Sequence, residues 1–234
     1  MSSAQRSGIA GWSIDLPDGW FEVPLEASSA AEAGSTAVSA GIDDVEHEWI
    51  RAVIDGAREA AVEPGSSTGL GTELRHVRQG LLSRADPWLR AAVSIRPEFE
   101  MTIGCLLIGS QAGLDPDDDA DAFALLLEEG YRHPGRGIRT HGWRTWRERL
   151  DAAEIVGSYQ RFETRDPGVE GGRIEDRTFF GIFPDGAMEM IRLEFTVSDL
   201  AAFRDIVDET AAIVRTVRFA LEGAADEFLG AKAP

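Results

Sequence analysis

Hydrophobic and polar residues alternate along six stretches of the chain, and this period of two predicts β-strands. In the run from 187 to 197, Ile191, Leu193 and Phe195 share one face while charged and polar residues occupy the other. Similar runs at 138–150, 153–164 and 173–183 are separated by Gly, Pro and Asp residues typical of turns, and two more lie at 89–95 and 99–107. Consecutive strands joined in this way predict an antiparallel sheet of about six strands.

The stretch WSIDLPDGWFEVPL, residues 12–25, shows the same alternation around a break. Trp12, Ile14 and Leu16 share one parity, and Pro17-Asp18-Gly19 has the chemistry of a turn. A second extended run follows, from Trp20 to Leu25. We therefore expect a hairpin or a bent strand, because a membrane anchor would need an unbroken apolar length that this stretch does not have.

Apolar residues that recur at every third or fourth position predict three helices. The first begins near Asp43 and ends before Pro64, the second begins with Asp115 as its N-cap, and the third follows Asp199. Their expected apolar stripes are Val45, Trp49, Val53, Ala57 and Ala60 in the first, Phe123, Leu126, Leu127 and Tyr131 in the second, and Leu200, Phe203, Val207, Thr210, Ala211 and Val214 in the third.

Three segments do not fit a strand or helix as clearly. Residues 27–41 are mostly Ala, Ser and Gly, which predicts a flexible loop, and residues 222–234 are expected to form a tail. Between 65 and 87, Leu70, Leu74, Val77 and Leu81 fit a helix, but the glycines in this segment oppose one. Taken together, the pattern predicts a single α+β domain over residues 1–234, with helices covering the sheet.

The charge of the chain narrows the classes of partner. There are 41 acidic residues against 23 basic ones, so the formal net charge is −18. A field of this sign repels phosphate backbones and anionic lipids, and we therefore expect neither a nucleic acid nor a membrane as partner. The same charge would suit a basic protein partner.

Cysteine usage, the first residues and lysine usage add three expectations. Cys105 is the only cysteine and lies within an apolar run, which predicts that it packs as a small hydrophobic residue. The first residues contain no apolar segment typical of a secretion signal, so we expect a cytoplasmic protein. The only lysine, Lys232, lies in the expected tail, which argues against catalysis by a Schiff-base or phosphate-loop lysine.

Motifs for metals, cofactors and common hydrolases are missing. The acidic run from Asp115 has Ala120 and Leu126 where a calcium loop of the EF-hand type needs Gly and Glu. The GLGTEL segment has Leu74 where a dinucleotide-binding motif needs its third glycine, and neither a nucleophile elbow nor an HExxH helix occurs. We therefore expect no cofactor and no metal, and we assign no catalytic residue.

The segment YRHPGRGIRTHGWRTWRER, residues 131–149, is rich in arginine and aromatic residues within an acidic protein. Neither the odd-numbered nor the even-numbered residues of its strand are mainly apolar, so neither face is suited to burial. We therefore expect the strand to be exposed on both faces or to lie at a sheet edge. Trp and Arg often dominate protein interfaces. Alternatively, the arginines neutralise the acidic helix before them. The candidate partner-binding residues are Arg139, His141, Trp143, Arg144, Trp146 and Arg147.

The opening WSIDLPDGW, together with the closing strand, helix and TVRF segment, resembles the PsbP-like and Mog-like fold family over residues 9–25 and 153–219. The resemblance implies a PsbP-like layered sandwich, in which helices enclose an antiparallel sheet. Members of this family include extrinsic photosystem subunits, Ran-binding proteins, mycobacterial lipoproteins and chaperones of type VI secretion effectors. The family has no shared catalytic motif, so the resemblance carries no site residue to this chain.

These observations lead to three hypotheses of function. The first is a protein-binding module without enzymatic activity, such as a cytoplasmic chaperone or adaptor of a secretion or assembly system, with a homodimer as a further alternative. The second is an acidic immunity-type protein that blocks a basic toxin. The third is an enzyme whose site forms only in space, for instance from His133, His141 and a carboxylate.

Overall fold

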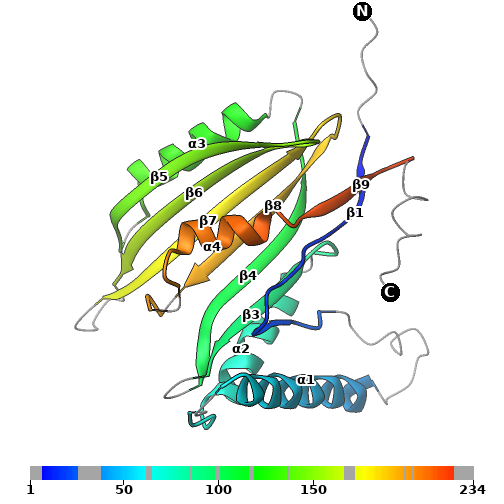
Figure 1. Ribbon diagram of the computed structural model, residues 1–234, viewed down its shortest axis with the longest axis vertical. Coiled ribbons are helices and arrows are strands. Elements are labelled where there is room, and N and C mark those ends of the chain that lie inside the picture. Colours follow the sequence, from blue (N-terminus) through cyan, green and yellow to red (C-terminus); the bar gives the residue numbers. More distant parts are fainter. Residues whose placement is uncertain are drawn as a thin grey trace, which may run out of the picture. The chain divides into compact units, whose positions relative to one another are not determined.

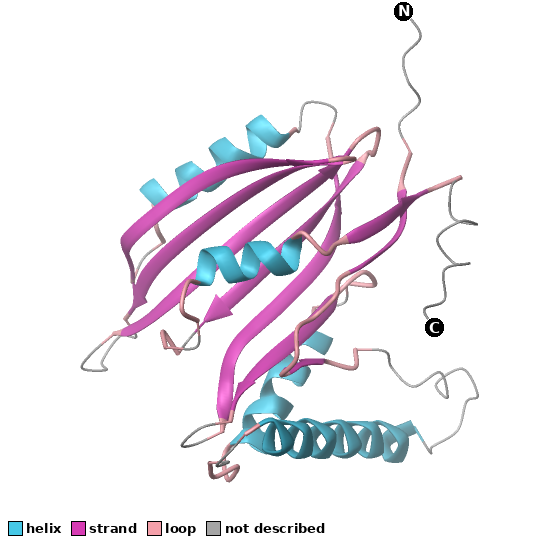
Figure 2. Cartoon of the chain, in the orientation of Figure 1, coloured by secondary structure: helices cyan, strands magenta, loops and turns pink. Residues whose placement is uncertain are grey.

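The computed structural model describes residues 7–25, 38–61, 65–84, 86–97, 101–115, 119–135, 137–165, 172–197, 199–201 and 203–223. The chain divides into a small unit, Pro17–Ile108, and a large unit formed by Met1–Leu16 with Gly109–Pro234. Both contain helices and strands, and every strand pair whose register is resolved is antiparallel, which confirms the α+β class (Figure 2). The hydrogen-bonded order of the main sheet is β2-β3-β4-β8-β7-β6-β5, seven strands rather than about six.

The small unit is built from two helices and the strands beside them. It contains β2 (Trp20–Glu22), α1 (Val38–Ala60), α2 (Leu70–Leu82), β3 (Arg90–Arg96) and the first part of β4 (Thr102–Gly113). Its core includes Val53, Leu70, Leu74, Val93 and Met101. Residues 65–87, for which the sequence left the structure open, thus contain a helix, and the helical spacing of Leu70 and Leu74 prevails over the glycines. Cys105 is buried as predicted, and burial raises the pKa of its thiol.

The buried stripe of α1 differs from the predicted one. Val45 is 39% exposed and Ala60 is exposed, whereas Glu46 and Ile50 are buried. The carboxylate of Glu46 can be buried because it accepts hydrogen bonds from Arg75, at 2.8 Å, and Arg78, at 3.3 Å. The predicted loop also ends earlier than expected, since residues 38–41 belong to α1; residues 26–37 lie outside the described part.

The prediction of a hairpin or a bent strand over residues 12–25 is wrong, because its two ends form separate strands in different sheets. Its turn exists, with a hydrogen bond from Trp20 N to Pro17 O at 3.2 Å and a φ of 81° at Gly19. However, β1 (Ile9–Ser13) pairs with β9 (Arg218–Leu221) near the other end of the chain, and β2 pairs with β3. Partners distant in sequence, rather than the local turn, therefore determine the pairing of both strands.

The large unit contains four consecutive antiparallel strands that the alternation predicted closely. These are β5 (Ile138–Leu150), β6 (Ala153–Thr164), β7 (Arg173–Pro184) and β8 (Glu189–Val197), and the last part of β4 also belongs to this unit. The helices α3 (Ala120–Arg132) and α4 (Ile206–Val214) lie on opposite faces of these strands (Figure 1). Phe123 of α3 packs at Gly181 of β7, while Thr210 of α4 accepts a hydrogen bond from Thr178, which has the opposite parity.

Both helices begin later than predicted. The N-cap of α3 is Asp119 rather than Asp115, because the Asp119 side chain accepts from Ala122 N at 2.9 Å. Leu126 is 67% exposed and does not belong to the buried stripe. The N-cap of α4 is Asp205, so Leu200 and Phe203 precede the helix, and Leu200 is 41% exposed. The predicted tail, residues 222–234, lies outside the described residues from 224 onward.

In the described residues, no helix has the length and apolar content that crossing a membrane requires.

Candidate functional site

The strand that carries most of the arginine-rich segment, β5, is the last strand of its sheet. It pairs with β6, and no other described strand pairs with it, as Figure 1 shows. The expectation of an edge position is therefore confirmed. An edge strand matters functionally because alternate backbone N–H and C=O groups point away from the sheet and can pair with another chain.

The hydrogen-bond phase identifies which residues of β5 present these groups. The amide of Asp185 donates to Ala152 O at 2.9 Å. Because backbone hydrogen bonds alternate along an antiparallel strand, the backbone groups of every second residue after Ala152 also bond to β7. Ala153, Ile155 and the residues of that parity consequently bond to β5. From the register of β5 with β6, the residues whose backbone groups point outward are Trp143, Thr145, Arg147 and Arg149.

This edge is regular over most of its length. The register between β5 and β6 shifts once, between Thr140 and Gly142, and runs without interruption from Gly142 to Leu150. His141 lies in the bulge, where its Nε2 is 3.1 Å from Oε2 of Glu163. A bulge of this kind interrupts the regular alternation of backbone groups along the edge. The segment available to an incoming strand therefore begins at Gly142.

The two tryptophans of β5 lie on opposite faces. Trp143 packs on α3, with its ring centroid 5.6 Å from that of Tyr131, and remains 37% exposed. Tyr131 is held by a short hydrogen bond to Ser158, and burial raises its pKa. Trp146 packs edge-on against Phe180 at 5.7 Å. Its ring also covers Gly157, where a Cβ would lie 2.3 Å from the indole.

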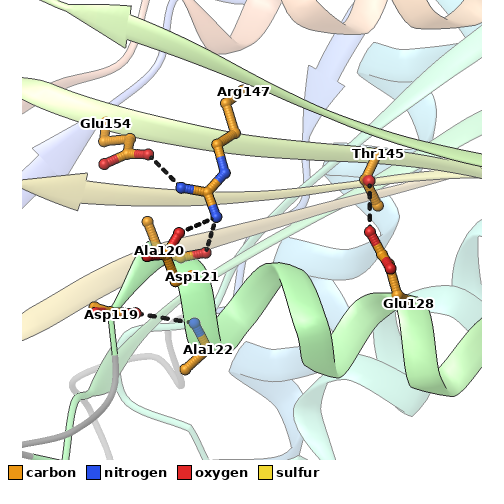
Figure 3. Close-up of polar contacts among 8 residues, drawn as sticks. All are labelled: Asp119, Ala120, Asp121, Ala122, Glu128, Thr145, Arg147 and Glu154. Carbon is orange, nitrogen blue, oxygen red and sulfur yellow. Dashed lines mark hydrogen bonds and ion pairs between the residues drawn. The ribbon is translucent and has the colours of Figure 1, made fainter.

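A groove of about 570 Å³ separates α3 from the edge of β5. Figure 3 shows Arg147 reaching across to α3, where it pairs with Asp121. Arg147 also contacts Glu154 of β6 at 3.1 Å. Thr145 donates to Glu128 at 3.3 Å on the same side. The hydrogen bond to Asp121 raises the pKa of Arg147. This contact agrees with the expectation that the arginines neutralise the acidic helix.

Two other arginines of β5 do not have such partners. In the described part of the chain, neither Arg139 nor Arg144 forms an ion pair, and Arg144 lies over the ring of Trp146 at 5.6 Å. Arg149 pairs with Asp185. By their register with β6, Arg139 and Arg144 lie on the α4 face of the sheet, whereas Arg147 and Arg149 lie on the α3 face. Unpaired positive charge is thus confined to the α4 face of β5.

The histidines of the enzyme hypothesis occupy structural positions. His133 is the C-cap residue of α3, with its backbone N–H bonded to Glu129 O at 3.0 Å. The pKa of Glu163, the partner of His141, is lowered by its hydrogen bond with Arg165, which makes the larger contribution, and by its hydrogen bond with His141. Among the residues that the structure describes, no group of three or more His, Cys, Asp or Glu side chains could hold a metal ion.

Sequence reasoning missed part of this site. The backbone N–H and C=O of Thr145 point away from the sheet because of the hydrogen-bond pattern between β5 and β6, and the residue types along the strand do not indicate this pattern. Leu125 and Leu126, which are 63% and 67% exposed, add apolar surface to α3, and Leu125 lines the groove. The sequence indicated the exposure of these leucines only through the run Leu125–Leu127, because three consecutive leucines cannot all lie on one buried helix face.

No protein-family model matches this chain, and no curated protein matches it either. The resemblance to the PsbP-like family accordingly remains an expectation from the sequence, and the function is inferred from the geometry above.

Proposed function

We propose that this protein is a protein-binding module that accepts an extended segment of another protein along the free edge of β5. The observation that supports this proposal is the uninterrupted run from Gly142 to Leu150, with outward backbone groups at Trp143, Thr145, Arg147 and Arg149. An added strand would gain main-chain hydrogen bonds along this run, as in other complexes formed by strand addition. A chaperone or adaptor of a secretion or assembly system could bind its partners in this way.

The groove beside α3 would supply specificity. Side chains of an added strand alternate between the two faces of the sheet, so half of them would lie over the groove lined by Ala124, Leu125 and Thr145. Apolar side chains of moderate size would contact the exposed Leu125 of α3 there. The charges of Asp121 and Arg147 already balance each other in the ion pair between them.

The other half of the side chains would lie on the α4 face, next to Arg144. Opposite charges in directly facing strand positions stabilise pairing by about 0.2–1 kcal/mol each. We therefore expect a carboxylate at the position of the partner segment that faces Arg144. A second copy of β5 fits less well, because pairing it with itself would bring the arginines of both strands together.

The net charge of −18 does not prevent this recognition. At physiological ionic strength, charges separated by more than about 8 Å are largely screened. The partner segment would therefore respond mainly to the arginines beside it rather than to the acidic residues of distant surfaces.

The test uses a phage-displayed library of random twelve-residue peptides selected on the whole protein. We expect enriched peptides to carry an acidic residue with an apolar residue on each side of it. Thr145→Pro removes one outward N–H without removing a bond to β6, and it should weaken peptide binding at least tenfold. The matched control, Thr145→Ala, keeps the N–H and should bind as the wild type does.

Two results would contradict the proposal. One is a Thr145→Pro variant that binds the selected peptides normally while its melting temperature shows that it is folded. The other is enrichment of basic peptides without a period of two, which would instead favour the hypothesis of an acidic protein that blocks a basic toxin.

A further inference from the structure

A second hollow, of about 520 Å³, lies on the α4 face of the same sheet. Its walls come from β5, β6 and β7, from the end of β8, and from the residues that lead into α4. Pockets that bind small molecules have volumes of about 300–1,000 Å³ and combine apolar walls with a few polar groups. The size of this hollow is therefore suited to a small ligand.

The floor of the pocket is a hydrogen-bonded network around Asp176, which is only 4% exposed. Tyr159 donates to Oδ1 of Asp176 at 3.0 Å, and Arg161 donates to both carboxylate oxygens at 2.7 Å. Burial raises the pKa of Tyr159, with a further contribution from Asp176, so its phenol keeps its proton. The charge of Asp176 is thus fully engaged by Arg161.

The second carboxylate of the lining is engaged as well. Asp205 caps α4 and accepts from Val207 N at 3.0 Å and Asp208 N at 3.1 Å. These bonds satisfy the first amides of the helix, and the positive end of the helix dipole stabilises the carboxylate. Both bonds are accepted by Oδ1, so Asp205 keeps its negative charge, and the lining carries three arginines, Arg144, Arg161 and Arg204, against two carboxylates.

Two arginines of the lining have no carboxylate partner in the described part of the chain. They are Arg144 of β5 and Arg204, which precedes the N-cap of α4. The lining also contains the apolar side chains of Val197, Leu200 and Phe203. Unpaired guanidinium groups beside an apolar wall favour an anion that carries an apolar body, because guanidinium binds carboxylates in a bidentate manner.

We propose that this pocket binds a small amphipathic carboxylate. Its carboxylate would bind Arg144 and Arg204, and its aliphatic body would pack on Leu200, Phe203 and Val197. The Tyr159–Asp176–Arg161 network would hold the floor in place. This site shares only Arg144 with strand addition at the edge, because it uses side chains on the α4 face whereas strand addition uses chiefly the outward backbone groups of β5.

Isothermal titration calorimetry with octanoate tests the proposal, with octan-1-ol and butyrate as matched probes. We expect octanoate to bind to one site, and octanol, which lacks the charge, and butyrate, which lacks the apolar body, to bind at least tenfold more weakly. The double variant Arg144→Gln with Arg204→Gln should weaken octanoate binding at least tenfold. The double variant Arg149→Gln with Arg218→Gln makes the same charge change outside the pocket and should bind normally.

No saturable octanoate binding up to millimolar concentrations would overturn the inference, and so would equal binding of octanol or an equal loss in the control variant. The Thr145→Pro variant separates this inference from the proposed function. It should bind octanoate as the wild type does, whether or not the edge accepts a strand.

Discussion

At the scale of single residues, the buried charges of this protein are held by matched partners. Glu46 in the small unit and Asp176 in the large unit are both buried, and each accepts hydrogen bonds from arginine. A buried ion pair contributes little net stability, but the loss of one partner leaves the other charge unbalanced in a poorly solvated site. These residues should consequently be sensitive to substitution of one partner alone.

Glu46→Ala should lower the free energy of unfolding by about 3 kcal/mol, because Arg78, which is 2% exposed, would lose its carboxylate partner. Urea denaturation measures this change. The matched control lies on the same helix, where Asp55 and its partner Arg58 are both at least half exposed. Asp55→Ala should change stability by less than about 0.5 kcal/mol. Equal effects of the two substitutions would contradict this account of the buried pair.

At the scale of elements, close packing between neighbouring strands fixes the shape of the exposed edge. Trp146 of β5 lies over Gly157 of β6 and against Phe180 of β7. This contact holds the middle of β5 against the sheet, so that its free edge keeps a defined geometry. Gly142 lies on the same strand, but a Cβ there would meet no atom within 4 Å.

Gly157→Ala should lower the free energy of unfolding by about 1–3 kcal/mol, because the added methyl group displaces the Trp146 ring. Gly142→Ala should be close to neutral. Chemical denaturation gives the stabilities, and tryptophan fluorescence should change for the first variant but not for the second. A neutral Gly157→Ala variant with unchanged fluorescence would show that the ring does not pack as described.

The elements also show what the sequence could and could not predict. The bounds of β5 to β8 follow from alternation and turn residues, because both signals are local. The hairpin of residues 12–25 was predicted wrongly, since β1 and β2 pair with distant strands. The stripe of α1 was misplaced because a glutamate is normally exposed, and only its arginine partners in α2 allow Glu46 to be buried.

For the candidate site, the mixed parity of residues 138–150 predicted the edge position of β5. The separate roles of its arginines were not predictable. Arg147 and Arg149 have carboxylate partners, whereas Arg139 and Arg144 have none among the described residues, and this difference depends on which face of the sheet each occupies. The pocket beside α4 gave no signal in the sequence, because its lining comes from four strands, a loop and the first turn of α4.

At the scale of the whole molecule, both proposed binding sites belong to the large unit. One uses the backbone of the β5 edge and the groove beside α3, and the other uses side chains on the α4 face. Arg144 lies next to both sites. A ligand in the pocket would therefore reduce the positive charge available to a strand on the edge, and the two binding events would be coupled through this residue.

The most direct test of the central claim is residue-resolved amide hydrogen exchange of β5, measured by NMR with and without a selected peptide. In the free protein, the amides of Arg144, Trp146 and Glu148 should exchange slowly because they bond to β6, while those of Trp143, Thr145, Arg147 and Arg149 should exchange fast. Peptide binding should slow exchange at this second set alone. Slower exchange at neither set, or equally at both, would contradict strand addition at this edge.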